Sequence, residues 1–339
     1  MTKYVVIDTS NLIHRVRHSI QRYDSIPELV SMVAHTFFLS LNKSYKKFNA
    51  DHLVLCFDEG SPYWRGMFLY PDYKLSRRTK KLTRTPEEIL IDKAMGELLD
   101  YLYEFFKNKT NVTALREYGI EADDFISRWT QLHPDDNHVI VSSDTDFRQL
   151  VSSNVEQYSP IDDTLYTNNG VYVQDGVRVS RRDIVVQLYG DNWKVKKDKK
   201  GEIVTFDPEW DLFFKCIRGD SSDFIKSSYP RVRETRLKEV FAKRGSLEWN
   251  KFLGEQWDKN DDDSPIVKDR YLFNKALIDL TQQPEEILEL LDEVIESEIM
   301  KTPTNMGMVA FGKLCRKYKL AKMMDYISII SKAISARYE

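Results

Sequence analysis

The sequence predicts an α/β fold with a mainly parallel, twisted sheet that is flanked by helices. Short apolar runs recur in the first half of the chain, and such runs are typical of strands that are buried on both faces. Longer stretches with apolar residues at helical spacing lie between these runs. Strand and helix therefore alternate, and this order favours parallel strands joined by right-handed crossovers.

Five apolar runs are expected to form the strands of this sheet. Two of them, YVVID at 4–8 and HLVLCFD at 52–58, end in aspartate. In chain order the expected strands are 4–8, 52–58, 111–117, 138–144 and 154–159. The sheet is therefore expected in the N-terminal half of the chain.

The stretches between the strands carry signals for the start of a helix. Ser25 and Glu28 have the spacing of a capping box at the start of the first long helix. Thr85 is the N-cap candidate of the second, with Pro86 as its first helical residue, acids in its first turn and lysines in its last. A third helix is expected from about Ala122.

Composition excludes several classes of protein. Hydrophobic residues make up 42% and aromatic residues 12% of the 339-residue chain, which supports a large core and argues against disorder. The three cysteines are widely spaced and form no Cys-x-x-Cys pair, so neither a disulfide framework nor a zinc site is expected. No apolar run reaches the roughly 20 residues that cross a bilayer, and the N-terminus lacks a signal-peptide pattern, so we expect a cytoplasmic protein without membrane contact.

The net charge of −3 hides charge that is segregated along the chain. Residues 61–84 hold seven Lys and Arg against one acid, and residues 226–251 hold eight against three. Residues 284–299, in contrast, hold seven acids and no base. A single charged block is usually only a solvated surface, but two basic blocks on either side of an acidic cluster are harder to explain in this way.

Carboxylates gather where the expected strands end. Asp8, Asp58 and Asp144 each lie at the carboxyl end of a strand, and Glu121 follows the third strand. Because ligands of open α/β sheets bind outside these ends, residues more than 130 positions apart should converge on one edge. Clustered carboxylates need protons or cations to neutralise them, and all-oxygen ligands select hard ions such as Mg²⁺ or Mn²⁺. The alternative, in which these residues only cap helices, explains one or two of them.

Two other families also place Asp-x-Asp at a strand end, as Asp144 and Asp146 do here. Phosphatases of the haloacid dehalogenase type need a Thr or Val two residues after the second Asp, where this chain has Arg148, and they place the motif after the first strand. Toprim domains would use Glu121 with the Asp-x-Asp pair but would leave Asp8 without a role. Both families therefore fit the sequence less well than a metal site shared by all these carboxylates.

Six motifs carry a resemblance to a known family: VVIDTSNLIHR, LCFDEGSPYWR, YKLSRR, IEADDFIS, VSSDTDFRQLV and CIRGDSSDFI. In order and spacing they resemble the 5′-nuclease family, which contains flap endonucleases and 5′-3′ exonucleases with a PIN-like core. The short YWR and GD..D forms are most similar to the bacteriophage RNase H branch. The resemblance runs from residue 4 to about 225, with a fainter continuation at 278–280.

The resemblance implies two metal sites, filled by Mg²⁺ or Mn²⁺, and hydrolysis of phosphodiester bonds. The first site would be formed by Asp8, Asp58, Glu121, Asp123 and Asp144. The second would be formed by Asp146, Asp220 and Asp223, with Asp124 beside them. Asp220 and Asp223 follow Gly219 three residues apart, so in a helical turn both carboxylates would face one way. Taken alone, the same segment is also typical of a capped turn.

The family also implies a basic arch over the active site, at about 66–100 in this chain. Lys74 and Arg77 match its YK..R pattern and are expected to contact the scissile phosphate. Further contacts to nucleic acid are expected from Arg65, Tyr73, Arg78, Lys80, Lys81 and Arg84. Trp64 is expected in the core rather than stacked on a base.

The chain departs from the family after the GD..D motif. Most members have a Gly-x-Gly hairpin there that binds the duplex backbone around a potassium ion. This chain has FIKSSYPRVRETRLKEVFAKRG instead, without those glycines, so no potassium site is expected. Duplex contacts are still expected from Lys226, Arg231, Arg233 and Arg236.

The expected organisation is a PIN-like nuclease core at 1–190, an inserted hairpin at 191–208, and a helical duplex-binding and C-terminal region at 209–339. The expected function is a divalent-metal-dependent 5′-3′ exonuclease and flap endonuclease, with RNase H activity, that removes RNA primers or 5′ flaps during DNA replication. A PIN-type ribonuclease or a structure-specific nucleic-acid binder is the alternative. The complete set of carboxylates argues against an inactive binder, and the arch bases argue against a minimal PIN ribonuclease.

The expected partners are nucleic acids with a particular structure. They are DNA and RNA/DNA hybrids that carry a 5′ flap, a nick or a primer. A single-stranded-DNA-binding protein or a clamp is a candidate protein partner. We expect a monomer that works in the cytoplasm, which would be that of the host if a phage encodes the protein.

Overall fold

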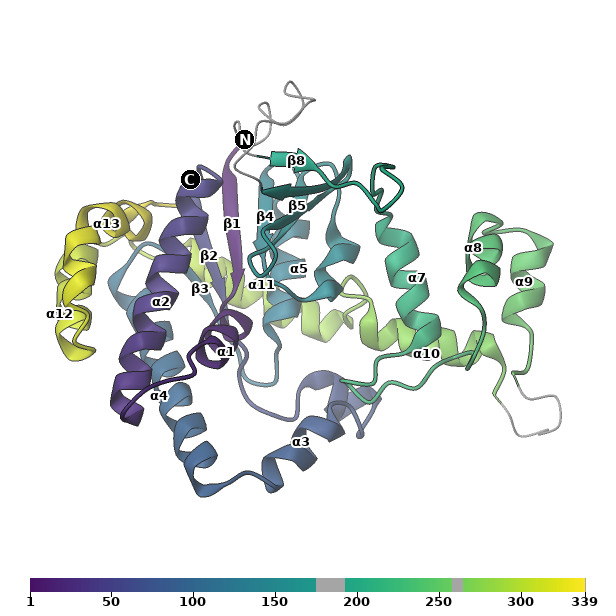
Figure 1. Ribbon diagram of the computed structural model, residues 1–339, viewed down its shortest axis with the longest axis horizontal. Helices are drawn as coiled ribbons and strands as arrows, with labels where there is room; N and C mark the ends of the chain where they lie inside the picture. The colour runs from purple at the N-terminus through teal and green to yellow at the C-terminus, as the bar shows by residue number, and fades with distance from the viewer. Residues whose placement is uncertain (175–192, 258–264, 339) are drawn as a thin grey trace. The chain divides into compact units, whose positions relative to one another are not determined.

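The computed structural model describes residues 1–174, 193–257 and 265–338, and its elements group into two compact units (Figure 1). Unit 1 comprises Met1–Ser61, Thr85–Phe206 and Glu285–Glu339, and unit 2 comprises Pro62–Arg84 and Asp207–Pro284. Over the described residues, no helix combines the length and the apolar character that a membrane-spanning helix needs.

Unit 1 is built on a sheet of eight strands, counted over the described residues, in the order β3-β2-β1-β4-β5-β6-β7-β8. The parallel strands are β1 (Lys3–Asp8), β2 (His52–Cys56), β3 (Thr113–Leu115), β4 (Asn137–Val141) and β5 (Val155–Ser159). They confirm the five predicted strands and the mainly parallel sheet. The register pairs Asp8 with Cys56 and Ile7 with Val141, so the carboxyl ends of β1, β2 and β4 lie at the same edge.

Three further strands extend the sheet beyond β5; the sequence did not predict the first two, whereas the third lies in the predicted hairpin at 191–208. They are β6 (Thr164–Thr167), β7 (Gly170–Gln174) and β8 (Trp193–Val195), all antiparallel to their neighbours. They are only three to five residues long, so each offers too few positions for a clear periodic pattern.

Helices cover both faces of the parallel strands. Val5 and Ile7 of β1 join one large apolar cluster with residues of α1 (Thr9–Ser19), α2 (Ile26–Lys47) and α4 (Pro86–Lys109). Tyr4 of β1 faces the other side, where its ring centroid lies 5.2 Å from that of Trp129 in α5 (Ala122–Leu132). The alternation along β1 therefore places one helical layer on each face, as the apolar runs predicted.

The C-terminal helices also belong to unit 1. They are α11 (Glu285–Ile299), α12 (Gly307–Lys317), the short 3₁₀ helix η3 (Ala321–Tyr326) and α13 (Ile327–Ser335). Helix α11 packs against α5 and β3, and α13 packs against α2 and β2. Phe311 of α12 lies in the same cluster as Phe38 of α2, with ring centroids 5.0 Å apart.

N-terminal caps explain where the helices of unit 1 begin. Thr85 and Glu88 form the complete capping box of α4, with hydrogen bonds of 3.2 and 2.7 Å between side chains and backbone N–H groups. Ser25 accepts a bond from the N–H of Glu28 at the start of α2, but the carboxylate of Glu28 accepts from Asp24 instead of Ser25. Helix α1, which was not predicted, begins directly after β1.

Unit 2 is helical and holds two small apolar clusters. Its elements are the π-helix η1 (Arg65–Leu69), α3 (Leu75–Leu82), α7 (Pro208–Arg218), α8 (Glu234–Ala242), α9 (Leu247–Leu253) and α10 (Val267–Ile278). One cluster forms around Phe213, Leu237 and Phe252. The other joins Tyr73 with Ile225 and with residues of α10, which is why segment 62–84 belongs to this unit.

The boundaries of the two units differ from the predicted organisation. The predicted arch at 66–100 is divided, because Ile91, Met95 and Leu98 of α4 are buried in the core of unit 1. The predicted region 209–339 is divided at 284/285 by the packing of the C-terminal helices. Of the predicted hairpin at 191–208, residues 191–192 lie outside the described residues, as do 175–190 of the predicted core. From 193 onward the chain forms β8 and a turn that is closed by a bridge between Lys197 and Ile203.

The turn after α7 requires a glycine at position 219. Gly219 has a φ of 71°, and a Cβ atom there would lie 2.4 Å from the carbonyl oxygen of Ile225. The approach is close because Asp220 and Ile225 exchange two backbone hydrogen bonds of 2.9 and 2.7 Å. Gly219 therefore holds the GD..D segment against the end of α7.

We expect Gly219→Ala to lower the thermal unfolding midpoint of the protein more than Gly245→Ala does. Both glycines lie in unit 2 with positive φ angles of 71° and 78°, so both variants carry a backbone cost for the added Cβ atom. Only at Gly219 does the new methyl group also meet backbone atoms, since nothing lies within 4 Å at Gly245. Circular dichroism on heating measures the difference, and equal midpoints would contradict this role for Gly219.

Candidate functional site

Asp8 is at the centre of the carboxylates on the carboxyl edge of the sheet. It is the last residue of β1 and the N-cap of α1, and one carboxylate oxygen accepts the N–H of Asn11 at 3.0 Å. The other oxygen accepts the hydroxyl of Ser142 at 3.2 Å, from the segment that follows β4. Since β2 and β4 lie on opposite sides of β1, Asp8 stands at the point where the strand order reverses, which is the usual ligand site of such sheets.

Asp58 connects the end of β2 to the first turn of α5. Its carboxylate accepts the N–H of Ala122 at 2.9 Å, and its own N–H donates to the hydroxyl of Ser10 at 3.0 Å. The carboxylate therefore takes the place of a cap at the N-terminus of α5, where the side chain of Glu121 makes no capping bond. Three further acids begin this helix: Glu121 and Asp124 are buried, and Asp123 is half-buried.

Asp144 is positioned by the loop after β4. It is the N-cap of the 3₁₀ helix η2 (Thr145–Leu150) and accepts the N–H of Asp146 at 3.0 Å. Its own N–H donates to the hydroxyl of Ser142 at 3.1 Å. The amide of Gln157 in β5 donates to the carbonyl oxygens of Ser142 and Asp144, at 3.0 and 2.5 Å. This network fixes the backbone that carries Asp144 and Asp146.

The charges of neighbouring carboxylates affect the pKa of Asp8. Burial, together with the charges of Asp58 and Asp144, raises the pKa of Asp8 to about 7, against the lowering effects of the Asn11 N–H and the Ser142 hydroxyl. Burial likewise raises the pKa of Cys56 well above its usual value, with Asp8, Asp123 and Asp58 adding to the effect. The thiol of Cys56 therefore stays neutral, and the available ligands are oxygens only.

This donor set fits a hard divalent cation. A cation at this edge would offset both the burial and the neighbouring charges that raise the pKa of Asp8, and oxygen ligands suit Mg²⁺ and Mn²⁺. In residues 1–174, 193–257 and 265–338, no three His, Cys, Asp or Glu side chains stand close enough together to enclose an ion as they are.

In unit 2, Asp220 is held inside the turn that follows Gly219. One oxygen accepts the N–H and the hydroxyl of Ser222 at 2.8 and 2.6 Å, and the other lies 3.0 Å from the ammonium of Lys215. Burial would raise the pKa of Asp220, but Ser222 and Lys215 outweigh it and lower the pKa to about 2. The segment is a capped turn and not a turn of helix. The hydroxyl of Ser222, which binds Asp220, also lies 3.5 Å from the carboxylate of Asp223, so the two carboxylates lie on the same side of the turn.

Asp223 binds the two residues that the sequence predicts at the scissile phosphate. Its carboxylate forms an ion pair with Arg77 at 2.8 Å and accepts the hydroxyl of Tyr73 at 3.4 Å. Its backbone carbonyl accepts the N–H of Lys74 at 3.0 Å. Lys74 has a φ of 56°, and its ammonium lies 5.2 Å from the ring centroids of both Tyr63 and Tyr73. Unit 2 thus brings Lys74, Arg77 and Asp223 together.

Three of the residues predicted to contact nucleic acid are engaged inside unit 2 instead. Arg65 is only 1% exposed, and its Nε donates to the carbonyl of Leu277 at 3.0 Å. Tyr73 is buried in an apolar cluster. Arg236 is half-buried and pairs with Glu255 at 2.5 Å. We correct the assignments of Arg65 and Tyr73, because their burial leaves no surface for a phosphate or a base. The side chain of Arg236 is 42% exposed, so its contact with nucleic acid stays a prediction.

The other predicted bases remain accessible. The exposed ones are Arg78, Lys80, Lys81, Lys226, Arg231 and Arg233. Arg84 is partly exposed, and Trp64 is buried as predicted. Helix α3 therefore presents a run of cations to solvent, and the segment before α8 presents a second group.

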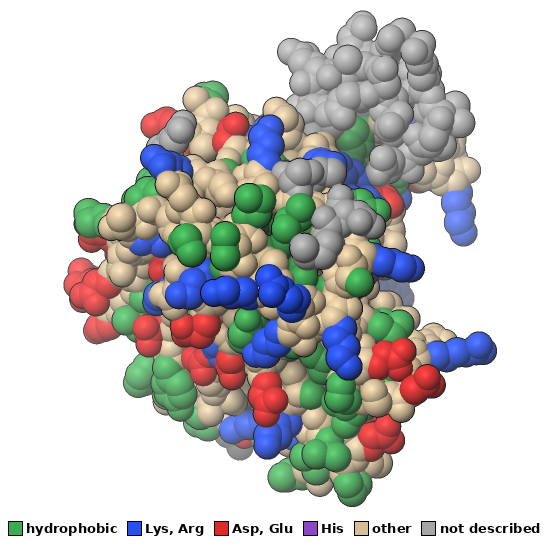
Figure 2. Space-filling view, turned by 90° about the vertical axis from the view of Figure 1, so that its left-hand side faces the viewer, with side chains coloured by type: hydrophobic (Ala, Val, Ile, Leu, Met, Phe, Trp, Pro, Cys, Tyr) green, Lys and Arg blue, Asp and Glu red, His purple; other side chains and the backbone are tan. Residues whose placement is uncertain are grey.

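Sequence reasoning missed a third basic segment, in α12 and η3 of unit 1. Its exposed members are Lys313, Arg316, Lys317, Lys319 and Lys322. Figure 2, which views the molecule from the side of α12 and α13, shows a row of Lys and Arg side chains across this face, with acidic side chains below it. The five bases among residues 313–322 face no acid in that stretch, and this sequence signal could have revealed the segment.

Flap endonucleases are among the known proteins that are similar in sequence to this chain. The chain is 29% identical over 157 residues to the flap endonuclease of Escherichia phage T5, which covers 46% of this chain and 50% of that protein. It is 23% identical over 195 residues to the flap endonuclease Xni of Psychromonas ingrahamii, which covers 56% of this chain and 66% of that protein. The matched stretches thus span about half to two thirds of these relatives.

Solved structures share the fold. A crystal structure of a phage T5 protein co-crystallised with metal ions matches with a TM-score of 0.60 at 18% identity, over 87% of this chain and 99% of that one. A T5 flap endonuclease in a complex with DNA and metal ions matches with the same TM-score at 19% identity, over 87% and 98%. The family model of the 5′-3′ exonuclease N-terminal resolvase-like domain matches residues 3–177, just over half of the 339 residues. The chain therefore belongs to the 5′-3′ exonuclease family.

Proposed function

We propose that this protein is a divalent-metal-dependent 5′-3′ exonuclease and flap endonuclease that hydrolyses phosphodiester bonds. The observation that carries the proposal is the edge of the sheet at which Asp8 is buried and the charges of Asp58 and Asp144 add to the effect of burial on its pKa. Such a set of buried oxygens, outside the carboxyl ends of parallel strands, is suited to cations that bind a phosphate. The relatives named flap endonucleases support the same reaction.

The ions are two Mg²⁺ or Mn²⁺ ions. Asp8, Asp58, Glu121, Asp123 and Asp144 hold the first, and Asp146, Asp220 and Asp223 hold the second, with Asp124 beside them. When bound, two such ions would activate a water and offset the negative charge that grows on the phosphate during hydrolysis. The chain's own contribution is orientation: Asn11 and Ser142 fix the carboxylate of Asp8, and Ala122 fixes that of Asp58.

The substrate is nucleic acid with a 5′ flap, a nick or an RNA primer. Lys74 and Arg77 bind the scissile phosphate and stabilise the charge that grows on it. The exposed bases of α3 attract the backbone of a single strand, and Lys226, Arg231 and Arg233 bind the backbone of a duplex. Removal of RNA primers and 5′ flaps during replication is the corresponding cellular role. Action as a monomer in the cytoplasm, with a clamp or a single-stranded-DNA-binding protein as partner, stays a prediction.

The test of the proposed function uses 5′-labelled flap, nicked and RNA-primed duplexes, with and without Mg²⁺. We expect cleavage near the 5′ end only in the presence of the ion. Asp144→Asn removes one charge from the carboxylate edge and should lower turnover by orders of magnitude. Asp135→Asn is the matched control, because it removes one charge from an exposed turn and should leave turnover unchanged. Near-normal turnover of the Asp144 variant in Mg²⁺ would refute the assignment.

The two groups of bases should differ in the step that they serve. Replacing Lys74 or Arg77 with Ala should lower single-turnover rates by about 100-fold with little loss of binding, because their charge acts in the transition state. Replacing Arg231 or Arg233 should weaken binding and reduce the salt dependence of log affinity by up to about one per phosphate contact. Arg236→Ala should also weaken binding, and its thermal midpoint should be measured beside its affinity because the change breaks the pair with Glu255.

Single-turnover kinetics at saturating enzyme and binding titrations in Ca²⁺ at several salt concentrations separate these effects. If the Lys74 and Arg77 variants only bind weakly, while the Arg231 and Arg233 variants bind normally, the assigned roles are wrong. A salt dependence that is unchanged in the Arg233 variant would remove that residue from the duplex contacts.

The raised pKa of Asp8 predicts how pH changes the stability of the metal-free protein. A carboxylate with a folded pKa of about 7 and an unfolded pKa of about 3.9 stabilises the fold below about pH 4 and loses that contribution as the pH rises to 7. The buried histidines His52 and His138, whose pKa values burial lowers to about 4, act in the opposite direction. The informative quantity is therefore the difference between the wild type and Asp8→Asn.

In EDTA, raising the pH from 5 to 7.5 should lower the free energy of unfolding of the wild type relative to Asp8→Asn, by about 2–4 kcal/mol. Addition of Ca²⁺ at pH 7.5 should stabilise the wild type more than the variant, because the ion binds only the folded carboxylates. Urea unfolding at the two pH values measures both effects. If the free energies of unfolding of the two proteins changed equally with pH, burial and the charges of Asp58 and Asp144 would not raise the pKa of Asp8.

A further inference from the structure

Two exposed histidines, His14 and His18, lie one turn apart on α1. Their spacing of four residues places both side chains on the same face of the helix. The two Nε2 atoms are 3.1 Å apart, and the ring centroids are 4.3 Å apart with an angle of 57° between the ring planes. Two imidazole nitrogens from successive turns therefore meet at one place on the surface of unit 1.

This distance fits a hydrogen bond or two ligands of one metal ion. Two neutral imidazoles can share an N–H···N bond, but at an exposed position water competes for both nitrogens and the net gain is small. Zinc–nitrogen bonds of about 2.0–2.1 Å, at an angle between a right angle and the tetrahedral angle, hold two nitrogens about 2.8–3.4 Å apart. The observed 3.1 Å lies within this range, so a bound ion requires no rearrangement of the helix.

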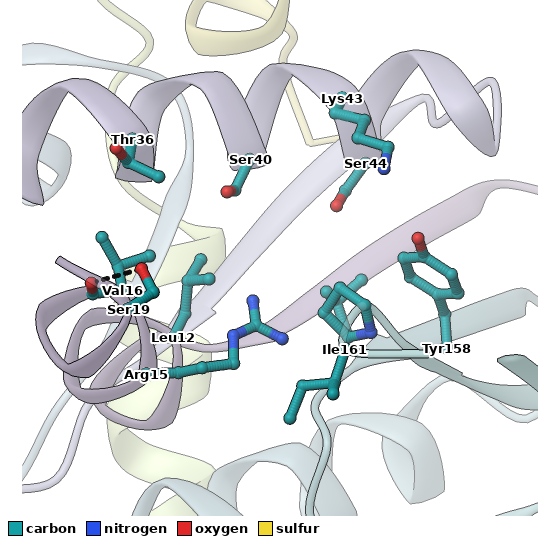
Figure 3. A pocket seen from close by; sticks show the side chains of 12 residues that line it. Leu12, Arg15, Val16, Ser19, Thr36, Ser40, Lys43, Ser44, Tyr158 and Ile161 are labelled. Carbon is teal, nitrogen blue, oxygen red and sulfur yellow. Dashed lines mark hydrogen bonds between the residues drawn. The ribbon is translucent and has the colours of Figure 1, made fainter. Parts of the chain in front are cut away.

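The basic side chains next to the pair on α1 have surroundings of their own. Arg15 extends into a cavity of about 520 Å³ whose walls include α1 and α2 (Figure 3). Neither His14 nor His18 lines this cavity, so Arg15 and the imidazole pair lie on different sides of the helix. The guanidinium of Arg17 lies 5.9 Å from the ring centroid of Tyr23. Arg15 therefore does not fill the space between the two imidazoles.

The other four histidines lack this arrangement. Three of them are buried, and the Nε2 atom of each already has a partner within unit 1; they are His52, His133 and His138. His35 has no second histidine three or four residues away in the sequence. The pair on α1 is thus the place where two accessible imidazole nitrogens stand at the distance that a metal ion needs.

The type of ligand selects the type of ion. Imidazole nitrogens suit Zn²⁺ and its neighbours Cu²⁺ and Ni²⁺, whereas Mg²⁺ prefers the oxygens found at the carboxylate edge. Two histidines four residues apart on one helix are also a common zinc-binding pair. Across the part of the chain that the structure describes, no third His, Cys, Asp or Glu stands with this pair, so water would complete the coordination of a bound ion.

We propose that His14 and His18 bind one Zn²⁺ ion through their Nε2 atoms, at a site separate from the carboxylate edge. His14 lies six residues after Asp8, which corresponds to a rise of about 9 Å along the helix. The site goes beyond the proposed nuclease reaction and does not rest on it, because no carboxylate and no nucleic acid takes part in binding.

A Zn²⁺ ion at this pair ties together two successive turns of α1. The first turn of the same helix positions two acids of the carboxylate edge: the N–H of Asn11 binds Asp8, and the hydroxyl of Ser10 accepts the N–H of Asp58. The ion therefore stabilises the helix that orients both acids, by an amount that grows with the concentration of free Zn²⁺.

The test is a calorimetric titration of the full chain with Zn²⁺ in an excess of Mg²⁺, which occupies the hard-ion sites, and without nucleic acid. We expect one Zn²⁺ ion per chain to bind at this pair. His14→Gln and His18→Gln should each weaken its binding at least about tenfold, since even groups that only orient a metal ligand have effects of this size. His35→Gln is the matched control, because it removes a histidine outside the pair and should leave the affinity unchanged.

A conservative variant separates a metal ligand from a hydrogen-bonding partner. His18→Cys supplies a thiolate, which is also a zinc ligand, so it should retain Zn²⁺ binding that His18→Gln loses. Because protons compete with the ion for the imidazole nitrogens, the affinity of the wild type should fall between about pH 7.5 and about pH 5.5. Zn²⁺ should also raise the thermal midpoint of the wild type and of His35→Gln more than that of His14→Gln.

Several outcomes would overturn the proposal. Equal Zn²⁺ affinity in the wild type, His14→Gln and His18→Gln would place the ion elsewhere, and no binding by the wild type would leave the pair as a hydrogen bond only. Equal loss in His18→Cys and His18→Gln would show that position 18 does not act as a ligand. Thermal midpoints without Zn²⁺ show whether each variant is folded. Cleavage assays with Mg²⁺ test the nuclease separately, so the failure of one proposal is distinguishable from the failure of the other.

Discussion

The organisation of unit 1 depends on the burial of several carboxylates at one edge of a parallel sheet. Parallel strands end at the same edge, so residues from distant parts of the chain meet there and their charges add. The groups that hold Asp8 are neutral, namely the N–H of Asn11 and the hydroxyl of Ser142. They fix its position without cancelling its charge, and this leaves the cancellation to a cation that comes from solution.

In unit 2, by contrast, two acids of the candidate site form ion pairs with basic side chains. Asp220 lies against Lys215, and Asp223 is paired with Arg77, so each negative charge has a cation from the same unit. The effect on proton affinity is clear, because the pKa of Asp220 is lowered to about 2 whereas that of Asp8 is raised to about 7. A phosphate that binds Arg77 must compete with Asp223 for the guanidinium, which links substrate binding to the state of that carboxylate.

Several residues of suitable type for binding nucleic acid serve the fold. Arg65 and Arg236 are cations, but each directs its guanidinium to an oxygen within unit 2. Tyr73 places its ring in an apolar cluster and its hydroxyl on Asp223. Residue type fixes the charge and the shape of a side chain, whereas its exposure depends on the segments that pack around it. Arg15, the last residue of the motif VVIDTSNLIHR, lines a cavity of unit 1, and its place in the motif did not reveal this position.

The sequence by itself determined the features that rest on local patterns. Apolar runs defined the five parallel strands, Thr85 and Glu88 defined the start of α4, and the acids at strand ends identified the edge where Asp8, Asp58 and Asp144 meet. Periodicity and capping act over a few residues, so one sequence suffices to detect them. Only the tertiary structure decided the antiparallel strands β6 and β7, the division of residues 209–339 between two units and the choice of exposed bases. These depend on contacts between distant segments, such as α11 on β3 or Arg236 on Glu255, and on burial, which no local pattern of residues encodes.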